Sequence, residues 1–449
     1  MLETTADPRR RIHATDGRGE AVRVTPAIVA AVAAGNAIEY FDFLAYAIFA
    51  IFIGKAYFPA DSALNSLLVS LAVFGVGFLT RPIGGALFGI IGDVVGRRSA
   101  LLWTLGLIAL GSLGIALTPS YASIGLLAPI VVVACRLLQG LALGGEMGPS
   151  SAFLIEIAPP HRRGLYQGWQ LASQGLGIAL AGGAGLVISE ILSPQELHAW
   201  GWRIPFVLSA LLVPLMALLR RAMPETAVAH PPRGTASESS GLGVGAGIFA
   251  AATVVIAGGA VTAYLGLYMT TYALHTLKMP VQVALAATLV VGVVLFVFAM
   301  LAGAMCDRYG RRALMVWPRL LSVVLLVPAF EWLVRAPNAL TLFSVSAGIA
   351  IINALSGGAS LIAIPELFPP RTRSRGTGMI YALGVALFGG TAQFVATWLL
   401  HATHQATAPA WYVAGISLIA AIAALFLPET RGALPEHRDA GPGAPERRR

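Results

Sequence analysis

Charged residues are scarce in this chain of 449 residues. Asp, Glu, Lys and Arg together make up 11% of it, whereas they make up about 25% of an ordinary soluble domain. Hydrophobic residues account for 57% of the chain. This balance excludes a soluble globular protein and predicts a protein that lies in a lipid bilayer.

Cysteine is almost absent, and its two copies, Cys135 and Cys306, fall in or beside separate apolar runs. This placement argues against a disulfide framework. The sequence also lacks a metal-ligand cluster, a phosphate-binding loop and a nucleophile triad, so we expect no enzymatic activity, no cofactor and no bound metal. The first 26 residues are polar and the first apolar run is too long for a cleavable signal peptide, so none is expected.

The net charge of +9 could suggest a nucleic-acid partner. However, most Lys and Arg residues lie in the two tails and in alternate loops, whereas Arg81, Arg136 and Arg319 lie within apolar runs. This asymmetry follows the rule that loops on the cytoplasmic side are rich in positive charge. We therefore expect no nucleic acid, a bilayer around the chain, and both termini in the cytoplasm.

Twelve apolar runs account for most of the chain, and most of them reach the roughly 20 residues that a transmembrane helix needs. The predicted fold class is therefore an all-α membrane protein with twelve transmembrane helices. The fourth run is too long for one straight span, and we expect its Gly and Pro residues near 144–149 to bend it. The runs cover residues 27–54, 64–91, 99–117, 122–155, 165–192, 202–221, 246–275, 281–305, 313–333, 339–364, 376–403 and 409–427.

The chain divides into five predicted segments. A linker rich in Pro and Ser separates two six-helix bundles, and polar tails flank them. The segments are a disordered cytoplasmic N-terminal tail (1–26), a first bundle (27–221), a cytoplasmic linker (222–245), a second bundle (246–428) and a cytoplasmic C-terminal tail (429–449).

One loop pattern occurs twice, after the second and after the eighth apolar run, about half a chain length apart. Each copy consists of Gly, three residues, Asp, two residues, Gly, Arg and Arg, so we interpret it as an internal duplication. Glycine permits close helix approach, and the Asp can accept hydrogen bonds from a helix N-terminus or pair with Arg. The repeats run in the same direction, which predicts a site between the two halves. The residues are Gly89, Asp93, Gly96, Arg97 and Arg98, and Gly303, Asp307, Gly310, Arg311 and Arg312.

This duplicated pattern resembles the loop signature of the major facilitator superfamily. Further stretches resemble the metabolite:proton symporter family, with helices 2, 4 and 5 most similar to its citrate and tricarballylate branch. The resemblance covers residues 27–430 and implies two pseudo-symmetric six-helix halves in a cell inner membrane, functional as a monomer. The stretches include Gly35-Asn36, Glu39, Asp42-Phe43, Arg81-Pro82-Ile83-Gly84-Gly85, Arg136-Leu137-Leu138-Gln139-Gly140, Gly144-Gly145-Glu146 and Gly201-Trp202-Arg203-Ile204-Pro205-Phe206.

The resemblance implies import of a small organic acid together with protons by alternating access. The expected substrate is citrate, tricarballylate or another di- or tricarboxylate. A proton-coupled importer of proline or betaine is one alternative, although the long C-terminal coiled coil often found in that branch is absent. A drug:proton efflux antiporter is another, although the Gly-Pro pair typical of its fifth helix is absent here.

Glu39 and Asp42 are the first candidates for proton coupling. They lie three residues apart in the first apolar run, on one face of a helix and near mid-membrane. A charge there is costly, and two close carboxylates raise the pKa of one of them. The alternative is a structural pair locked to Arg81 or Arg136.

Arg136 and Gln139 are candidates in the fourth run for proton coupling and substrate binding. Because Arg stays protonated in almost any site, it must face a carboxylate, the substrate or water. Arg136 can bind a substrate carboxylate through a bidentate fork. The alternative is a permanent salt bridge to Glu39 or Asp42, and the two roles are compatible as alternating states.

Glu146 is a second possible proton site. Its alternative is an ion pair with a loop arginine such as Arg97, which the position of Glu146 towards the cytoplasmic end favours. Arg81 precedes a proline in the second run, and a structural role is favoured there over substrate contact.

Several uncharged polar residues are further candidates for substrate binding. Gln170 and Gln174 form a helical stripe with Gln167, which either bonds to other helices or lines a water-filled path. Tyr264, Tyr268 and Tyr272 form another stripe, suited to packing or to substrate contact. The remaining candidates are Asn36, Asn353 and Gln393.

Overall fold

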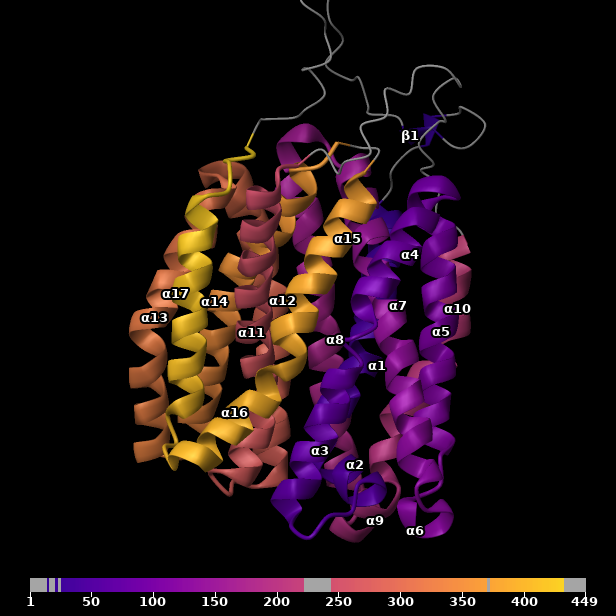
Figure 1. Cartoon of the computed structure of the whole chain (residues 1–449), viewed down its shortest axis with the longest axis vertical. Helices are drawn as coiled ribbons and strands as arrows, with labels where there is room; N and C mark the ends of the chain where they lie inside the picture. Colours follow the sequence, from indigo (N-terminus) through magenta and orange to yellow (C-terminus); the bar gives the residue numbers. More distant parts are fainter. Residues whose placement is uncertain (1–13, 16–20, 23–25, 222–243, 370–371, 432–449) are drawn as a thin grey trace, which may run out of the picture.

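The computed structural model describes residues 14–15, 21–22, 26–221, 244–369 and 372–431. Long helices run side by side along the longest axis of the molecule (Figure 1). The elements before the linker are β1 (Ala14–Thr15), β2 (Ala21–Val22), α1 (Pro26–Ile48), α2 (Ala50–Tyr57), α3 (Ala63–Val76), α4 (Arg81–Val94), α5 (Arg97–Leu117), α6 (Tyr121–Ile124), α7 (Leu127–Ile157), η1 (Pro160–Arg162), α8 (Arg163–Ile191), α9 (Pro194–Ala199), η2 (Gly201–Arg203) and α10 (Ile204–Arg221).

The elements after the linker form the second group of helices. In Figure 1 they lie beside the first group, so the two parts of the chain face one another across a long interface. These elements are α11 (Ala246–His275), α12 (Val281–Tyr309), α13 (Arg311–Arg335), α14 (Ala339–Glu366), α15 (Arg373–Gly384), the π-helical turn η3 (Val385–Gly389), α16 (Gly390–Thr403) and α17 (Ala408–Leu425).

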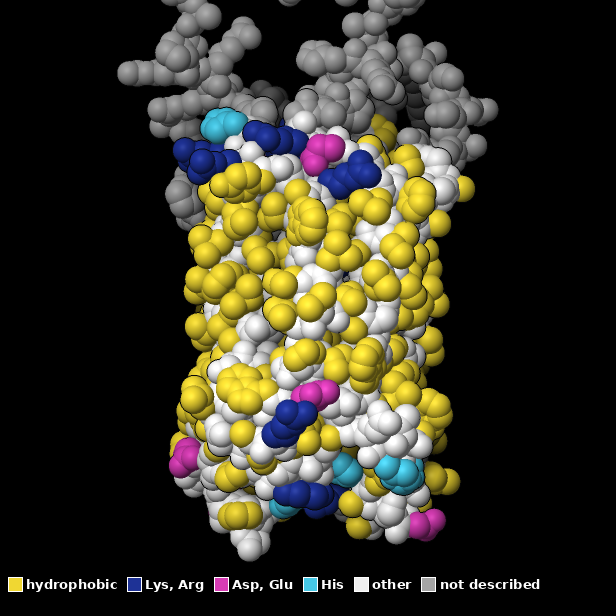
Figure 2. Space-filling model, turned by 90° about the vertical axis from the view of Figure 1, so that its left-hand side faces the viewer, with side chains coloured by type: hydrophobic (Ala, Val, Ile, Leu, Met, Phe, Trp, Pro, Cys, Tyr) yellow, Lys and Arg dark blue, Asp and Glu magenta, His cyan; other side chains and the backbone are white. Residues whose placement is uncertain are grey.

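The predicted twelve transmembrane helices are confirmed. Eleven described helices are long and apolar enough to cross a membrane, and the pair α1 and α2, bent by 64°, makes a twelfth. Several of these spans join two elements, such as α3 with α4 and α15 with η3 and α16. Large apolar side chains cover a broad belt between charged ends (Figure 2), as a protein surrounded by lipid requires.

Two local features add detail to the sequence-based expectation. The tail predicted to be disordered contains the short antiparallel pair β1–β2, with Ala14 opposite Val22. The fourth span, α7, is one continuous helix, and its glycines serve close packing: a β-carbon at Gly144 would lie 2.2 Å from the carbonyl oxygen of Arg81. The linker prediction falls almost entirely on residues 222–243, outside the described residues, and the bounds of the two bundles stay predictions.

Small residues bring the two helix groups together. A β-carbon at Gly292 on α12 would lie 2.2 Å from the backbone nitrogen of Ala179 on α8, and one at Gly182 would lie 2.6 Å from that of Leu289. Without a hydrophobic driving force between helices in lipid, such close backbone packing is what associates them. The α8–α12 contact therefore holds the two groups together along one side of the interface.

The duplicated loops lie at one end of the bundle, called here the motif end. Gly96 and Gly310 directly precede α5 and α13 and have φ angles of 133° and 93°. These angles favour glycine because a β-carbon is strained there. The second glycine of each pattern is thus required by the chain reversal.

Candidate functional site

A cavity lies between the two helix groups. It is lined from α1 and α8 on one side and from α11, α12, α14, α15 and η3 on the other. Most of its wall is apolar, and its polar side chains are Gln174, Asn353, Thr262, Ser360, Tyr40, Tyr264 and Tyr381. A largely apolar pocket with a few convergent polar groups is the usual form of a small-molecule site.

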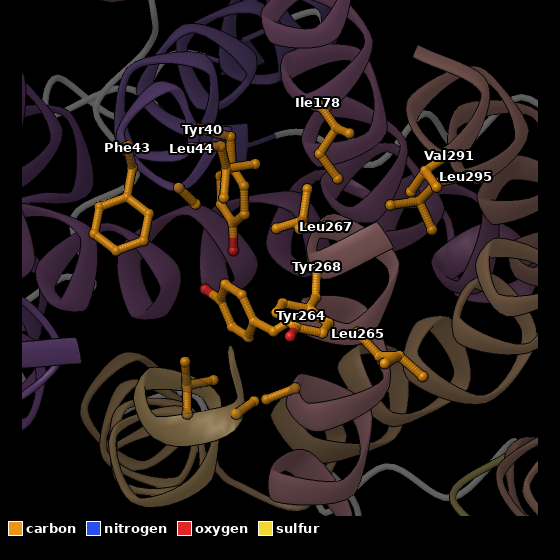
Figure 3. Packing of buried hydrophobic residues seen from close by; sticks show 14 of the residues in the cluster. Tyr40, Phe43, Leu44, Ile178, Tyr264, Leu265, Leu267, Tyr268, Val291 and Leu295 are labelled. Carbon is orange, nitrogen blue, oxygen red and sulfur yellow. The ribbon is translucent and has the colours of Figure 1, made fainter. Parts of the chain in front are cut away.

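Tyrosines from both helix groups meet at this cavity. The hydroxyls of Tyr40 and Tyr381 lie 2.7 Å apart and form a hydrogen bond that joins α1 to α15. Figure 3 shows the hydroxyl of Tyr264 directed towards that of Tyr40. A single set of phenol groups therefore connects the two halves and faces the cavity. Sequence reasoning missed Tyr40 and Tyr381, since no tyrosine stripe marked them.

Two buried arginines stack on aromatic rings beside the cavity. The guanidinium of Arg136 lies 4.2 Å from the ring centre of Phe43, and that of Arg81 lies 4.6 Å from the same ring. Arg81 also lies 3.8 Å from Phe78, whose ring packs against cavity-lining Tyr264 at 5.3 Å. These cation–π contacts stabilise the positive charges without neutralising them.

Among the described residues, Arg136 is linked to a carboxylate through the side-chain amide of Gln139. It donates from Nη1 to Oε1 of Gln139 at 2.8 Å, and Nε2 of Gln139 donates to Oδ2 of Asp42 at 2.7 Å. The permanent salt bridge considered for Arg136 is therefore wrong in this structure, since neither Glu39 nor Asp42 pairs directly with it. The chain from Asp42 to Arg136 gives a proton site and an anion site a shared hydrogen-bonded path.

Glu39 and Glu146 share a partner that sequence reasoning missed. Arg220, on α10, donates to Oε1 of Glu39 at 2.8 Å and to Oε1 of Glu146 at 2.6 Å, and all three side chains are buried. The expected pairing of Glu146 with Arg97 is wrong, because Arg97 pairs with Asp93 and Glu156. The sequence pattern did not single out Arg220, because it stands next to Arg221 at the end of an apolar run.

The other predicted contact residues divide between the cavity and the helix interfaces. Gln174, Tyr264 and Asn353 line the cavity. Asn36 instead donates to the carbonyl of Gln170 and to Ser173, which ties α1 to α8. Three more lie in helix interfaces: Gln170 donates to Ser150, Tyr268 accepts from Thr397, and Tyr272 donates to the carbonyl of Ala406. The amide of Gln393 is buried without a partner among the described residues.

The first duplicated loop binds the opposite half of the protein. Asp93 pairs with Arg97, and its other oxygen accepts a hydrogen bond at 3.3 Å from the backbone N–H of Arg375, in the first turn of α15. Arg97 extends this network to Glu156 at the end of α7. A carboxylate at a helix N-terminus is stabilised by the helix dipole.

The second loop repeats this arrangement in the other direction. Asp307 accepts hydrogen bonds from the backbone N–H groups of Gly164 at 2.9 Å and Leu165 at 3.1 Å, at the start of α8. Arg311 pairs with Asp307 and, more closely, with Glu366. Each loop Asp thus holds the N-terminus of a helix from the other half, so the two halves are hydrogen-bonded to one another at the motif end.

Glu429 reinforces the second loop. Its carboxylate accepts hydrogen bonds from the backbone N–H groups of Arg311 and Arg312 at the start of α13. Partial burial opposes ionisation, but these bonds and one from Arg431 outweigh it and lower the pKa of Glu429 below its ordinary value. The same Pro-Glu-Thr triplet follows the sixth and the twelfth apolar runs, and the first copy, with Glu225, lies outside the described residues.

Comparisons with known proteins agree with this architecture. Residues 27–229 match a family model described as sugar (and other) transporter, and residues 280–447 match one described as Major Facilitator Superfamily. A citrate-proton symporter of Klebsiella pneumoniae is 36% identical over 403 residues, which cover 88% of this chain and 90% of that protein. The chain belongs to the major facilitator superfamily.

One further relative and one solved structure agree with this membership. An alpha-ketoglutarate permease of Escherichia coli (strain K12) is 33% identical over 429 residues, covering 94% of this chain and 95% of that protein. The solved structure of the proton:xylose symporter XylE, bound to 6-bromo-6-deoxy-D-glucose, has a TM-score of 0.76 at 19% identity and covers 91% of this chain and 97% of that one. At that identity the likeness to XylE shows the fold alone.

Proposed function

We propose that this protein is a secondary active transporter that imports a small organic acid together with protons by alternating access. The observation that carries this proposal is the pair of buried guanidiniums, Arg81 and Arg136, beside the cavity. Within the described residues, neither forms a direct salt bridge, and Nε and Nη2 of Arg136 have no hydrogen-bond partner. Buried cations that lack a counter-charge favour an anionic ligand.

The relatives support the same substrate class. The Klebsiella relative is named for citrate, a tricarboxylate, together with protons. The Escherichia relative is named for alpha-ketoglutarate, a dicarboxylate. In the proposed cycle, protonation of Asp42 releases Gln139 and Arg136 to bind the substrate anion. Loss of the proton restores the Asp42–Gln139 bond and favours substrate release. The proposal therefore assigns proton coupling to side chains only, with no cofactor or metal.

The arrangement of charges supports an orientation as well. The motif end, with Arg98, Arg308 and Arg312, is proposed to face the cytoplasm, because positive charges are retained on that side. The loop Asp contacts would then close the cytoplasmic end while substrate enters from outside. We also propose that the protein works as a monomer in a cell inner membrane and that it transports its substrate without converting it chemically.

An importer of an osmolyte such as betaine is the second candidate. One observation favours it: Tyr40, Tyr264 and Tyr381 converge on the cavity, and tyrosine rings can bind a quaternary ammonium by cation–π contacts. No acidic side chain lines the cavity in the described residues, so a cationic group would depend on those rings alone. The uncompensated arginines therefore favour the organic acid.

Uptake by reconstituted vesicles with an imposed pH gradient tests the proposal. Labelled citrate, tricarballylate, succinate, 2-oxoglutarate and betaine would be compared with and without a protonophore. We expect accumulation of at least one carboxylate that the protonophore abolishes, and no accumulation by an Arg136→Ala variant. Accumulation of betaine alone would support the second candidate, and proton-driven export of apolar cations would support efflux instead.

A further inference from the structure

Arg319 is a buried cation in the second half of the protein whose partners are all neutral. It lies on α13 and is 2% exposed. Its Nη1 donates to the carbonyl of Met315 at 2.5 Å, and its Nη2 donates to the carbonyl of Val255 at 3.1 Å and to the hydroxyl of Ser360 at 3.0 Å. These bonds fix the guanidinium but leave its charge uncompensated.

The helices around Arg319 cannot supply the missing negative charge. Neither α11 nor α17 contains an acidic residue, the only acid in α14 is Glu366 at its end, and Glu366 pairs with Arg311. On α13 itself the only acid is Glu331, which pairs with Arg335 near the opposite end. None of these four helices therefore offers Arg319 an unpaired acidic side chain.

The guanidinium lies directly behind the cavity wall. Its partners Val255 and Ser360 both line the cavity, as do Gly259 and Gly357. A β-carbon added at Gly259 would lie 3.8 Å from Nη2 of Arg319 and 3.8 Å from the Cα of Gly357. The two glycines place no side chain of their own on the wall where the guanidinium approaches it. The amide of Asn353 lies beside them, since a β-carbon added at Gly357 would meet its Oδ1 at 3.1 Å.

We propose that Arg319 binds a second carboxylate of the substrate at the cavity wall formed by Gly259 and Gly357, and that it selects di- and tricarboxylates over monocarboxylates. This inference rests on the proposed transport of an organic acid. Arg136 serves the first carboxylate in the first half, and Arg319 serves the second from the second half. A substrate that contacts both halves stabilises the closed state more than one that contacts a single half.

Binding of matched acids to the purified protein tests this role. Calorimetry would compare propane-1,2,3-tricarboxylate, which has three carboxylates, with butyrate, which has one and a similar carbon chain. We expect Arg319→Gln to weaken tricarboxylate binding about tenfold or more, the effect of a lost charge-assisted contact, and to leave butyrate binding unchanged. Arg319→Lys, which keeps the charge but not the fork, should fall between the two.

A second variant leaves Arg319 in place. Gly259→Val places a side chain on the wall in front of Arg319 and should produce the same selective loss, whereas Gly348→Val on α14, at a glycine with open space around it, should change nothing. If Arg319→Gln does not fold, Gly259→Val alone decides the question.

The outcomes separate this inference from the proposal on which it rests. Unchanged tricarboxylate binding in the Arg319 and Gly259 variants would overturn the role of Arg319 while leaving organic-acid transport intact. An equal loss for tricarboxylate and butyrate would also overturn it, because it would show general damage to the site. A wild-type protein that binds no carboxylate at all would instead refute the proposed function.

Discussion

Nη2 of Arg220 donates a hydrogen bond to Oε1 of Glu146 across 2.6 Å, although the two residues are 74 positions apart. The same guanidinium reaches Glu39, so one cation from α10 holds two carboxylates from α1 and α7. With both carboxylates ionised the group carries one net negative charge, and with one protonated it is neutral. Burial favours the neutral form, which makes this triad a second place where a proton can enter the transport cycle.

Removal of Arg220 should destabilise the protein. Breaking a buried ion pair by deleting one partner costs about 3–5 kcal/mol, because the remaining charge is left unpaired. Arg220→Gln should therefore lower the thermal unfolding temperature in detergent by several degrees, and adding Glu146→Gln should recover part of the loss. Arg221→Gln, on an exposed neighbouring side chain, is the control. Equal unfolding temperatures for Arg220→Gln and the control would contradict this account.

If a carboxylate of α1 carries the proton, a neutral variant of it should lose uphill substrate accumulation but keep substrate exchange. Glu39→Gln and Asp42→Asn imitate the protonated carboxylates. At the residue that carries the proton, the swap should abolish uphill accumulation but keep exchange of preloaded substrate, because the bound state no longer depends on the gradient. Accumulation in vesicles with and without a protonophore measures this. Full, protonophore-sensitive accumulation by both variants would place the proton elsewhere, with Glu146 the next candidate.

The loop carboxylates should control rate more than affinity. Asp93 and Asp307 each hold the N-terminus of a helix from the opposite half, so they stabilise one conformational state. Asp93→Asn and Asp307→Asn should slow transport several-fold and change the substrate Kd little. Asp61→Asn, in an exposed loop at the other end, should have no effect. A large loss of affinity at unchanged turnover would show that these loops shape the site itself.

The proposed orientation can be tested by thiol labelling. Cys135 and Cys306 are both buried, so the native background is low. A cysteine at exposed position 312 should resist an impermeant reagent added to intact cells, and one at exposed position 198 should react. The opposite pattern would place the motif end outside.

The sequence by itself determined the spans and the repeated loops. Twelve apolar runs predicted the transmembrane helices because, in lipid, each spanning segment must satisfy its own backbone hydrogen bonds and expose apolar side chains. The loop pattern predicted the chain reversals because the φ angles of Gly96 and Gly310 favour glycine whatever surrounds them. These features depend on local sequence, so they can be recognised without knowing which helices meet.

Only the tertiary structure decided which charges pair and which residues face the cavity. The sequence marked Glu39, Asp42, Arg136 and Glu146 as costly groups in lipid that need partners, yet their pairing depends on which helix faces meet. Packing of α10 against α1 and α5 brings Arg220 inward, so it displaces the expected partners of both glutamates. Similarly, Tyr264 faces the cavity whereas Tyr268 and Tyr272 bond to neighbouring backbone and side chains, because only the first of the stripe lies opposite α1 and α15.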